Sequence, residues 1–146
     1  MRFISVFLVF LWCSVSFAAD MASIGLNGLI NEIGSNSAKT MVVFWAPWCP
    51  HCKRELKILR DNPQFVANNK LQVICLTKAK DKKRAEDFVA DEKMPYKFFL
   101  ADQAIYDKYQ KIDAVPLTLI FDRSGKVLDF EYGKQNIEDL ALMLED

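Results

Sequence analysis

Two cysteines separated by two residues, Cys49 and Cys52, are the residues of this chain best suited to chemistry. They follow the apolar run 41–45 and open a segment with the pattern of an amphipathic helix. Two cysteines at this spacing on the first turn of a helix lie close enough to form a disulfide with little strain. The partial positive charge at a helix N-terminus helps the first sulfur to ionise. The spacing therefore predicts a reversible dithiol/disulfide pair in which Cys49 is the attacking atom.

The two residues between the cysteines fit the same prediction. Pro50 suits the first helical position, where its missing N–H costs nothing. His51 places a second potential positive charge beside the Cys49 sulfur, and a positive charge there stabilises the reduced, thiolate form. A pair whose reduced form is stabilised is a stronger oxidant. The alternative for His51 is a solvated helix residue that takes no part in the chemistry.

Half of a zinc site is the alternative interpretation of the cysteine pair. A structural zinc ion needs four ligands, and the one histidine of the chain lies inside the motif. This count favours redox chemistry, in which Cys49 forms a mixed disulfide with a partner and the buried Cys52 thiol releases it. Cys75 lies in the middle of an apolar run and is expected to be a buried, inert thiol.

Length and charge limit the possible architectures and partners. The chain has 146 residues, which is enough for one domain with a proper core. Lys and Arg together number 19, and so do Asp and Glu. Because the charges balance, the composition does not point to nucleic acid or to an anionic membrane surface. We expect a monomer that binds no nucleic acid.

The N-terminus has the layout of a secretory signal peptide. A basic start precedes an apolar stretch over residues 3–17, and Ser16 and Ala18 supply the small residues of a cleavage site. The sequence therefore predicts a signal peptide over residues 1–18, a domain over residues 19–146, and export to the periplasm, where disulfides persist. An uncleaved membrane anchor is the alternative, although the apolar stretch is short against the ~20 residues of a membrane span.

Apolar periodicity predicts alternating helices and strands in the rest of the chain. Helices are expected at 24–33, 49–62, 81–93 and 102–109 and from Asn136 onward, and strands at 41–45, 71–77, 96–100, 117–121 and 127–132. Asn62-Pro63 should kink or end the second helix, because a residue before proline avoids the helical conformation. Asp102 is a candidate N-cap. This order predicts an α/β sandwich with a mixed sheet and a terminal hairpin.

The chain resembles the thioredoxin superfamily in two stretches, 44–53 around the cysteine pair and 114–118 before the predicted fourth strand. The resemblance implies a thioredoxin fold. It also implies that the Val115–Pro116 peptide bond is cis, that Pro116 packs against the disulfide and that the Val115 backbone binds the substrate strand. A cis X-Pro bond is uncommon, so this isomer is implied by the resemblance alone.

The spacing between the two stretches resembles that of the exported TlpA/ResA/DsbE-like branch. It is too long for a minimal thioredoxin and too short for the helical insertion of DsbA. The strand 96–100 and the helix 105–109 resemble the branch's insertion before the cis-proline. Glu55 lies where many members carry an acidic residue, and it could relay a proton to Cys52 if partly buried; a solvated helix carboxylate is the alternative. Val43 stands where thioredoxins place a buried acid, so Cys52 lacks that proton acceptor.

These likenesses imply a thiol–disulfide oxidoreductase that acts on protein cysteines without a dissociable cofactor. A membrane redox partner, DsbB-like or DsbD/CcdA-like, would reset the pair. DsbA-like oxidants carry the same Pro-His dipeptide between their cysteines and a valine before the cis-proline. Pro50-His51 and Val115 therefore favour oxidation. The TlpA/ResA-like branch also contains reductants, including those of cytochrome c maturation, so a reductase is the alternative.

Two further expectations concern binding. Trp45 is expected in the core, whereas Trp48 should lie on the rim of the site and present an apolar face to the substrate. A function of a different class is a non-catalytic module that binds peptides or copper on the same fold. Activity that depends on Cys49 would distinguish the enzyme from such a module.

Overall fold

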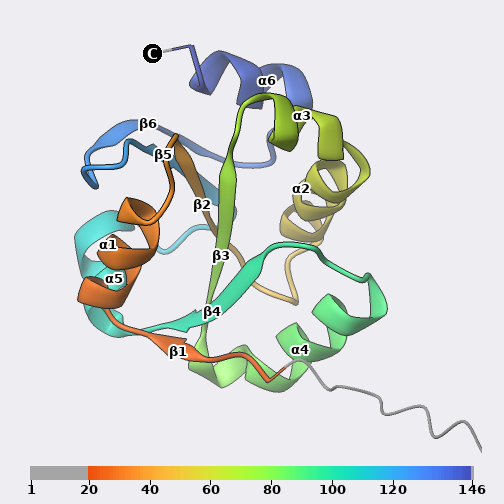
Figure 1. The fold of residues 1–146 in the computed structure, drawn as a ribbon. Helices are drawn as coiled ribbons and strands as arrows, with labels where there is room; N and C mark the ends of the chain where they lie inside the picture. The colour runs from red at the N-terminus through yellow and green to blue at the C-terminus, as the bar shows by residue number, and fades with distance from the viewer. Residues whose placement is uncertain (1–19, 146) are drawn as a thin grey trace, which may run out of the picture.

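The computed structural model describes residues 20–145 (Figure 1). The predicted signal peptide, residues 1–18, lies outside the described residues. Within the described range, none of the helices combines the length and the apolar character that crossing a bilayer requires.

A mixed six-stranded sheet forms the centre of the described chain. Its order is β1-β4-β3-β2-β5-β6; β5 runs antiparallel to β2 and to β6, and the other neighbours are parallel. The strands are β1 (Ser23–Ile24), β2 (Thr40–Phe44), β3 (Gln72–Lys78), β4 (Lys97–Ala101), β5 (Leu117–Phe121) and β6 (Val127–Tyr132).

Helices cover both faces of this sheet, as Figure 1 shows. On one face lie α2 (Pro50–Asp61), α4 (Lys82–Asp91) and α6 (Ile137–Met143), with the short α3 (Pro63–Asn68) continuing from α2. On the other face lie α1 (Leu26–Gly34) and α5 (Gln103–Tyr109). The predicted α/β sandwich with a mixed sheet is therefore confirmed.

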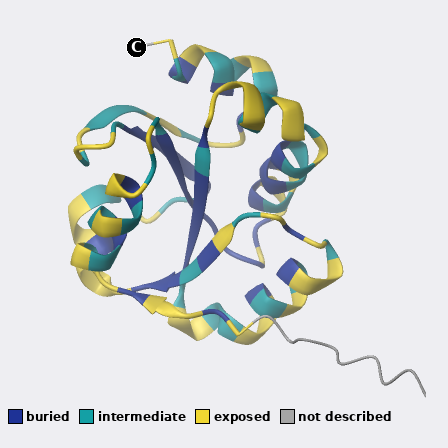
Figure 2. Cartoon of the chain, in the orientation of Figure 1, coloured by how far each residue is buried: buried dark blue, intermediate teal, exposed yellow. Residues whose placement is uncertain are grey.

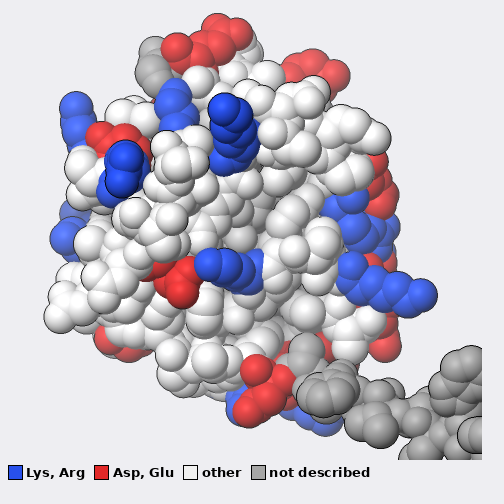
Figure 3. Space-filling view, viewed as in Figure 1, with Lys and Arg blue, Asp and Glu red and all other residues white. Residues whose placement is uncertain are grey.

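The central strands are buried on both faces because alternate side chains enter two separate cores. Met41 and Val43 of β2 pack toward α2 and α4, whereas Val42 and Phe44 pack toward α1 and α5. This double burial explains why β2 is an uninterrupted apolar run. Figure 2 shows the resulting contrast between buried inner strands and exposed outer helix faces. On the face drawn in Figure 3, charged side chains of both signs are interspersed, as the balanced composition predicts.

Most predicted elements are confirmed with small shifts at their ends. The break at Asn62-Pro63 separates α2 from α3, and the Asp102 carboxylate caps α5 by accepting a hydrogen bond from Ile105 N–H at 3.1 Å. The predicted insertion is present as β4 and α5, and β4 lies between β3 and β1. These elements widen the sheet on the side away from β5.

The prediction of a helix at 24–33 is wrong at the N-terminal end. Ser23 and Ile24 form β1, which pairs in parallel with Leu100 and Ala101 of β4, and the helix begins only at Leu26. A two-residue strand is too short to show an alternating pattern. Its formation depends on backbone hydrogen bonds to a strand that lies far along the chain.

Candidate active site

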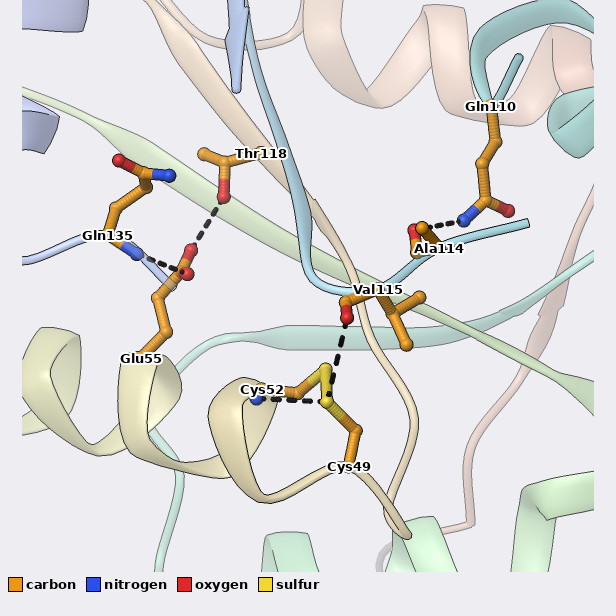
Figure 4. Close-up of a disulfide and its surroundings, with 8 residues drawn as sticks. All are labelled: Cys49, Cys52, Glu55, Gln110, Ala114, Val115, Thr118 and Gln135. Atoms are coloured by element: carbon orange, nitrogen blue, oxygen red, sulfur yellow. Dashed lines mark hydrogen bonds between the residues drawn. A yellow bond between two sulfur atoms is a disulfide. The ribbon is translucent and has the colours of Figure 1, made fainter. Parts of the chain in front are cut away.

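The two cysteines form a disulfide at the start of α2 (Figure 4). Cys49 is the N-cap, with extended backbone, and its N–H donates to the Ala46 carbonyl at 3.1 Å. Pro50 occupies the first turn, and Cys52 follows within that turn. The Cα atoms of Cys49 and Cys52 lie 5.3 Å apart, within the range usual for a disulfide. The helix start predicted from the motif is thus confirmed.

The first sulfur lies in a position that favours negative charge. The Cys52 N–H donates to Cys49 Sγ at 3.2 Å, so one of the unpaired amides of the helix N-terminus points at this sulfur. The helix dipole acts in the same direction. Cys49 keeps 5 % of its surface exposed and Cys52 none, so only the Cys49 sulfur is open to a partner. His51 is exposed on the helix beside it.

The segment before β5 faces the disulfide. The Val115–Pro116 peptide bond is cis, as the resemblance implied, and Pro116 is buried. The Val115 carbonyl oxygen lies 3.8 Å from Cys49 Sγ (Figure 4). Within residues 20–145 the Val115 N–H donates no hydrogen bond. A free amide beside the sulfur is an available partner for an extended polypeptide.

The two tryptophans lie where the sequence predicted. Trp45 is 2 % exposed and packs against Phe88 and Phe98, whereas Trp48 is 53 % exposed next to Cys49. A cleft of about 80 Å³ lies between Trp48 and Val115, and Lys78, Lys80, Asp81 and Asp113 also line it. Trp48 and Val115 therefore contribute apolar surface near the sulfur, whereas the cleft between them also carries charged side chains.

Glu55, one turn after Cys52 on the same helix, is fully buried. Its Oε1 accepts a hydrogen bond from the Thr118 hydroxyl at 2.6 Å, and its Oε2 accepts one from the Gln135 N–H at 2.9 Å (Figure 4). Burial raises the pKa of the Glu55 carboxyl, and these two hydrogen bonds offset only part of the rise. The alternative of a solvated helix carboxylate is wrong.

A buried acid lies near Val43, although the sequence suggested no acid there. Val43 pairs with Thr118 across β2 and β5, and the Glu55 carboxyl binds the Thr118 hydroxyl. A buried carboxyl from α2 therefore lies near the strand position Val43. Sequence reasoning missed Gln135, because it holds the carboxyl through its backbone N–H, which leaves no trace in residue type.

Cys75 is buried in β3, as predicted. Burial raises the pKa of the Cys75 thiol, and the nearby Glu55 carboxylate raises it further. A thiol that stays protonated is a poor nucleophile. Among residues 20–145, no three His, Cys, Asp or Glu side chains gather as a set of metal ligands.

Comparison with known proteins gives consistent results. A family model described as a thioredoxin-like domain matches residues 26–146. The chain is 25 % identical to sporulation thiol-disulfide oxidoreductase A of Bacillus subtilis over 79 % of this chain and 72 % of the relative. It is 21 % identical to the thiol-disulfide oxidoreductase ResA of Geobacillus thermodenitrificans over 89 % of this chain and 75 % of that protein.

Solved structures show the same fold. The crystal structure of StoA from Bacillus subtilis matches with a TM-score of 0.63 and 21 % identity, over 75 % of this chain and 84 % of that one. At this identity the likeness supports the fold alone. The names of the sequence relatives are consistent with an oxidoreductase that uses a cysteine pair.

The raised pKa of Glu55 predicts a pH-dependent stability. The folded protein favours the protonated carboxyl, so the contribution of Glu55 to the free energy of unfolding is greatest in acid and falls as the pH rises through the raised pKa. Glu55→Gln cannot titrate, and its amide can still donate to Thr118 and accept from Gln135. The stability of Glu55→Gln relative to wild type should therefore increase from about pH 4 to about pH 8, measured by urea unfolding of the oxidised proteins.

The matched control is Glu131→Gln, which removes an exposed carboxyl from β6. Its stability difference from wild type should stay nearly constant over the same pH range. A Glu55→Gln difference that is equally flat would contradict the assignment of a buried, proton-retaining acid.

Proposed function

Because the chain belongs to the thioredoxin-like domain family, we propose that it is an exported thiol–disulfide oxidoreductase that exchanges its Cys49–Cys52 pair with cysteines of exported proteins. One observation carries this proposal: the Cys49 sulfur caps α2 and accepts the Cys52 N–H at 3.2 Å. This geometry stabilises a thiolate on the more accessible of the two sulfurs. A thiolate there makes Cys49 an effective nucleophile and a good leaving group.

As a disulfide donor, the chain reacts in two exchange steps. A client thiolate attacks Cys49 Sγ, the Cys49–Cys52 bond breaks, and its electron pair leaves on Cys52 Sγ, which takes up a proton. A second client thiolate then attacks the client sulfur of the mixed disulfide, and Cys49 leaves as a thiolate. The client has lost two electrons and gained a disulfide, and the chain holds the electrons as a dithiol.

Glu55 is the proposed proton source for Cys52. The two side chains lie on the buried face of α2, and the raised pKa lets Glu55 keep its proton at a higher pH than an ordinary glutamate. When Cys52 leaves as a thiolate, a neighbouring acid can protonate it. In the opposite direction, Glu55 would accept the Cys52 proton.

The client is proposed to bind along the segment that faces the sulfur. The Val115 N–H and carbonyl offer a short edge for pairing with an extended chain, and Pro116 fixes that segment against the disulfide. Trp48 provides an exposed apolar surface next to Cys49. Pro50 is exposed on the first turn of α2 and completes the surface that a client meets.

We propose oxidation as the direction, because the helix N-terminus, the Cys52 N–H and the exposed His51 all favour the reduced form of the pair. One observation supports a reductase of the cytochrome c maturation type. A buried carboxylate at Glu55 opposes other anions nearby, as its effect on the pKa of Cys75 indicates. A measurement of the equilibrium redox potential of the cysteine pair would distinguish oxidation from reduction.

The location and the partners complete the proposal. The N-terminal pattern supports export to the periplasm, either as a cleaved protein or through an uncleaved anchor. A membrane protein of the DsbB type would reoxidise a donor, and one of the DsbD/CcdA type would reduce a reductase. We propose that the chain works as a monomer and needs no cofactor, because the cysteine pair itself carries the electrons.

Trapping tests the roles of the two cysteines. Cys52→Ser should accumulate mixed disulfides with client proteins, because the thiol that releases them is missing. Cys49→Ser should trap nothing and should lose insulin reduction and the refolding of a reduced substrate. Cys75→Ala, which removes the buried third thiol, is the control and should behave as wild type in both assays. Exchange that survives Cys49→Ser would contradict the role of Cys49, and absence of exchange in the wild-type protein would leave a non-catalytic peptide or copper module as the better explanation.

The role of His51 is tested by the equilibrium redox potential against glutathione. His51→Ala should make the pair less oxidising by about 30 mV if the imidazolium contributes about 1.4 kcal/mol to the reduced form. His51→Arg should retain most of the wild-type potential, since it keeps a positive charge at the helix start. An unchanged potential in His51→Ala would show that the imidazole has no part in setting it.

A further inference from the structure

A second surface, separate from the disulfide, lies beside the edge strand β6. It is a groove of about 330 Å³ between the end of α5 and the strands β5 and β6. We call it the β6 groove, and the residues that line it are Lys108, Tyr109, Lys111, Leu119, Val127, Phe130 and Tyr132. None of them belongs to the site described above.

The groove exists because the helix layer stops short of the sheet edge. Phe130 and Tyr132 of β6 pair with Leu119 and Leu117 of β5, so their side chains share the face that α1 and α5 cover elsewhere. The last turn of α5 reaches Tyr109 and goes no further. Phe130 is left 56 % exposed, with its ring against that of Tyr132 at 6.4 Å. An exposed aromatic cluster of this kind is typical of an interaction site.

The charged residues that line the groove have one sign. Lys108 and Lys111 line it, and among residues 20–145 neither lysine has an ion-pair partner. The acidic residues of the strand, Asp129 and Glu131, pair with Ile120 and Thr118 and so belong to the opposite face of the sheet. A segment that fills the groove therefore meets apolar rings and two ammonium groups, of which that of Lys108 lies 5.4 Å from the centre of the Tyr109 ring. The complementary ligand carries apolar side chains and carboxylates.

The groove is continuous with the proposed client-binding segment. The loop after α5 leads from Lys111 to Val115, and the Tyr132 hydroxyl lies 3.5 Å from the Ile112 N–H in the middle of that loop. Ile112 itself is 57 % exposed, which extends the apolar surface toward the disulfide. Four extended residues span at most about 14 Å, so a client chain that leaves Val115 along this loop reaches the groove within about four residues.

We propose that the β6 groove binds an apolar, acidic segment of the client polypeptide, about four to six residues from the cysteine that reacts with Cys49. The inference rests on the proposed function and adds to it the class of client sequence. Docking there would hold the client during the mixed-disulfide stage, when only one covalent bond joins the two chains. The exposed aromatic surface supplies the apolar contact, and the lysines select its charge.

The test measures exchange with synthetic peptides. Each peptide carries one cysteine as a mixed disulfide with thionitrobenzoate, then a short Gly/Ser spacer, then Leu-Phe-Glu-Glu, Leu-Phe-Lys-Lys or Ser-Ser-Glu-Glu. The reduced wild-type protein attacks the peptide sulfur through Cys49 and expels the coloured thionitrobenzoate, and Cys52 then releases the peptide thiol. The Leu-Phe-Glu-Glu peptide should react about tenfold faster than the other two, since each of them lacks one complementary feature.

Variants of the groove locate the effect. Phe130→Ser should remove the preference for Leu-Phe, and Lys108→Glu with Lys111→Glu should reverse the preference for Glu over Lys. The controls are Leu142→Ser, which removes an apolar side chain 63 % exposed on α6, and Lys70→Glu, at an exposed lysine before β3; both should keep the wild-type preferences. The mixed disulfide of glutathione with thionitrobenzoate is too small to reach the groove, so its rate should be the same in all groove variants.

The outcomes separate the groove from the disulfide chemistry. Equal rates for the three peptides, or preferences that survive the groove substitutions, would overturn the inference while the glutathione reaction still supports the proposed function. Failure of the wild-type protein to react with the glutathione derivative would refute the proposed function and the inference with it. A wild-type dimer in sedimentation that Phe130→Ser dissociates would assign the groove to a second copy and would also overturn the inference.

Discussion

The chemistry of this protein depends on the position of one sulfur at the N-terminus of one helix. Cys49 takes the place of a capping side chain on α2, and the Cys52 N–H that a helix start leaves unpaired points at its sulfur. The other parts of the site position this sulfur or surround it. The buried strand β2 fixes where the helix begins, and the cis-proline segment fixes what lies over the sulfur.

The acid of the site comes from the helix and not from the strand. Glu55 projects from α2 toward Thr118 on β5, which lies opposite Val43 on β2. One helix therefore carries both sulfurs of the disulfide and the buried carboxyl. The cost of burying the Glu55 carboxyl is limited by two hydrogen bonds and by its ability to stay protonated. This arrangement makes the acid sensitive to any shift of α2 against the sheet.

Local features of the sequence were sufficient to predict the helix start, the order of most elements and the burial of Trp45 and Cys75. They act over short distances: a proline at the first turn, an apolar run, a break before Pro63. The resemblance to thioredoxins supplied the cis bond at Val115–Pro116, which no local pattern indicates. The partners of Glu55 could not be predicted, because Gln135 lies 80 residues away and contributes a backbone N–H. The exposed face of β6 could not be predicted either, because it depends on where α5 ends relative to β6, which comes later in the chain.

The central claim is that the helix N-terminus holds a negative charge on Cys49 in the reduced protein. It is tested most directly by the ultraviolet absorbance of thiolate in reduced Cys52→Ser, in which Cys49 is the more accessible of the remaining described thiols and Cys75 stays protonated. Strong thiolate absorbance is expected already at neutral pH, and it should disappear only in acid. Absorbance that develops only in alkaline solution, as for an ordinary free thiol, would contradict it.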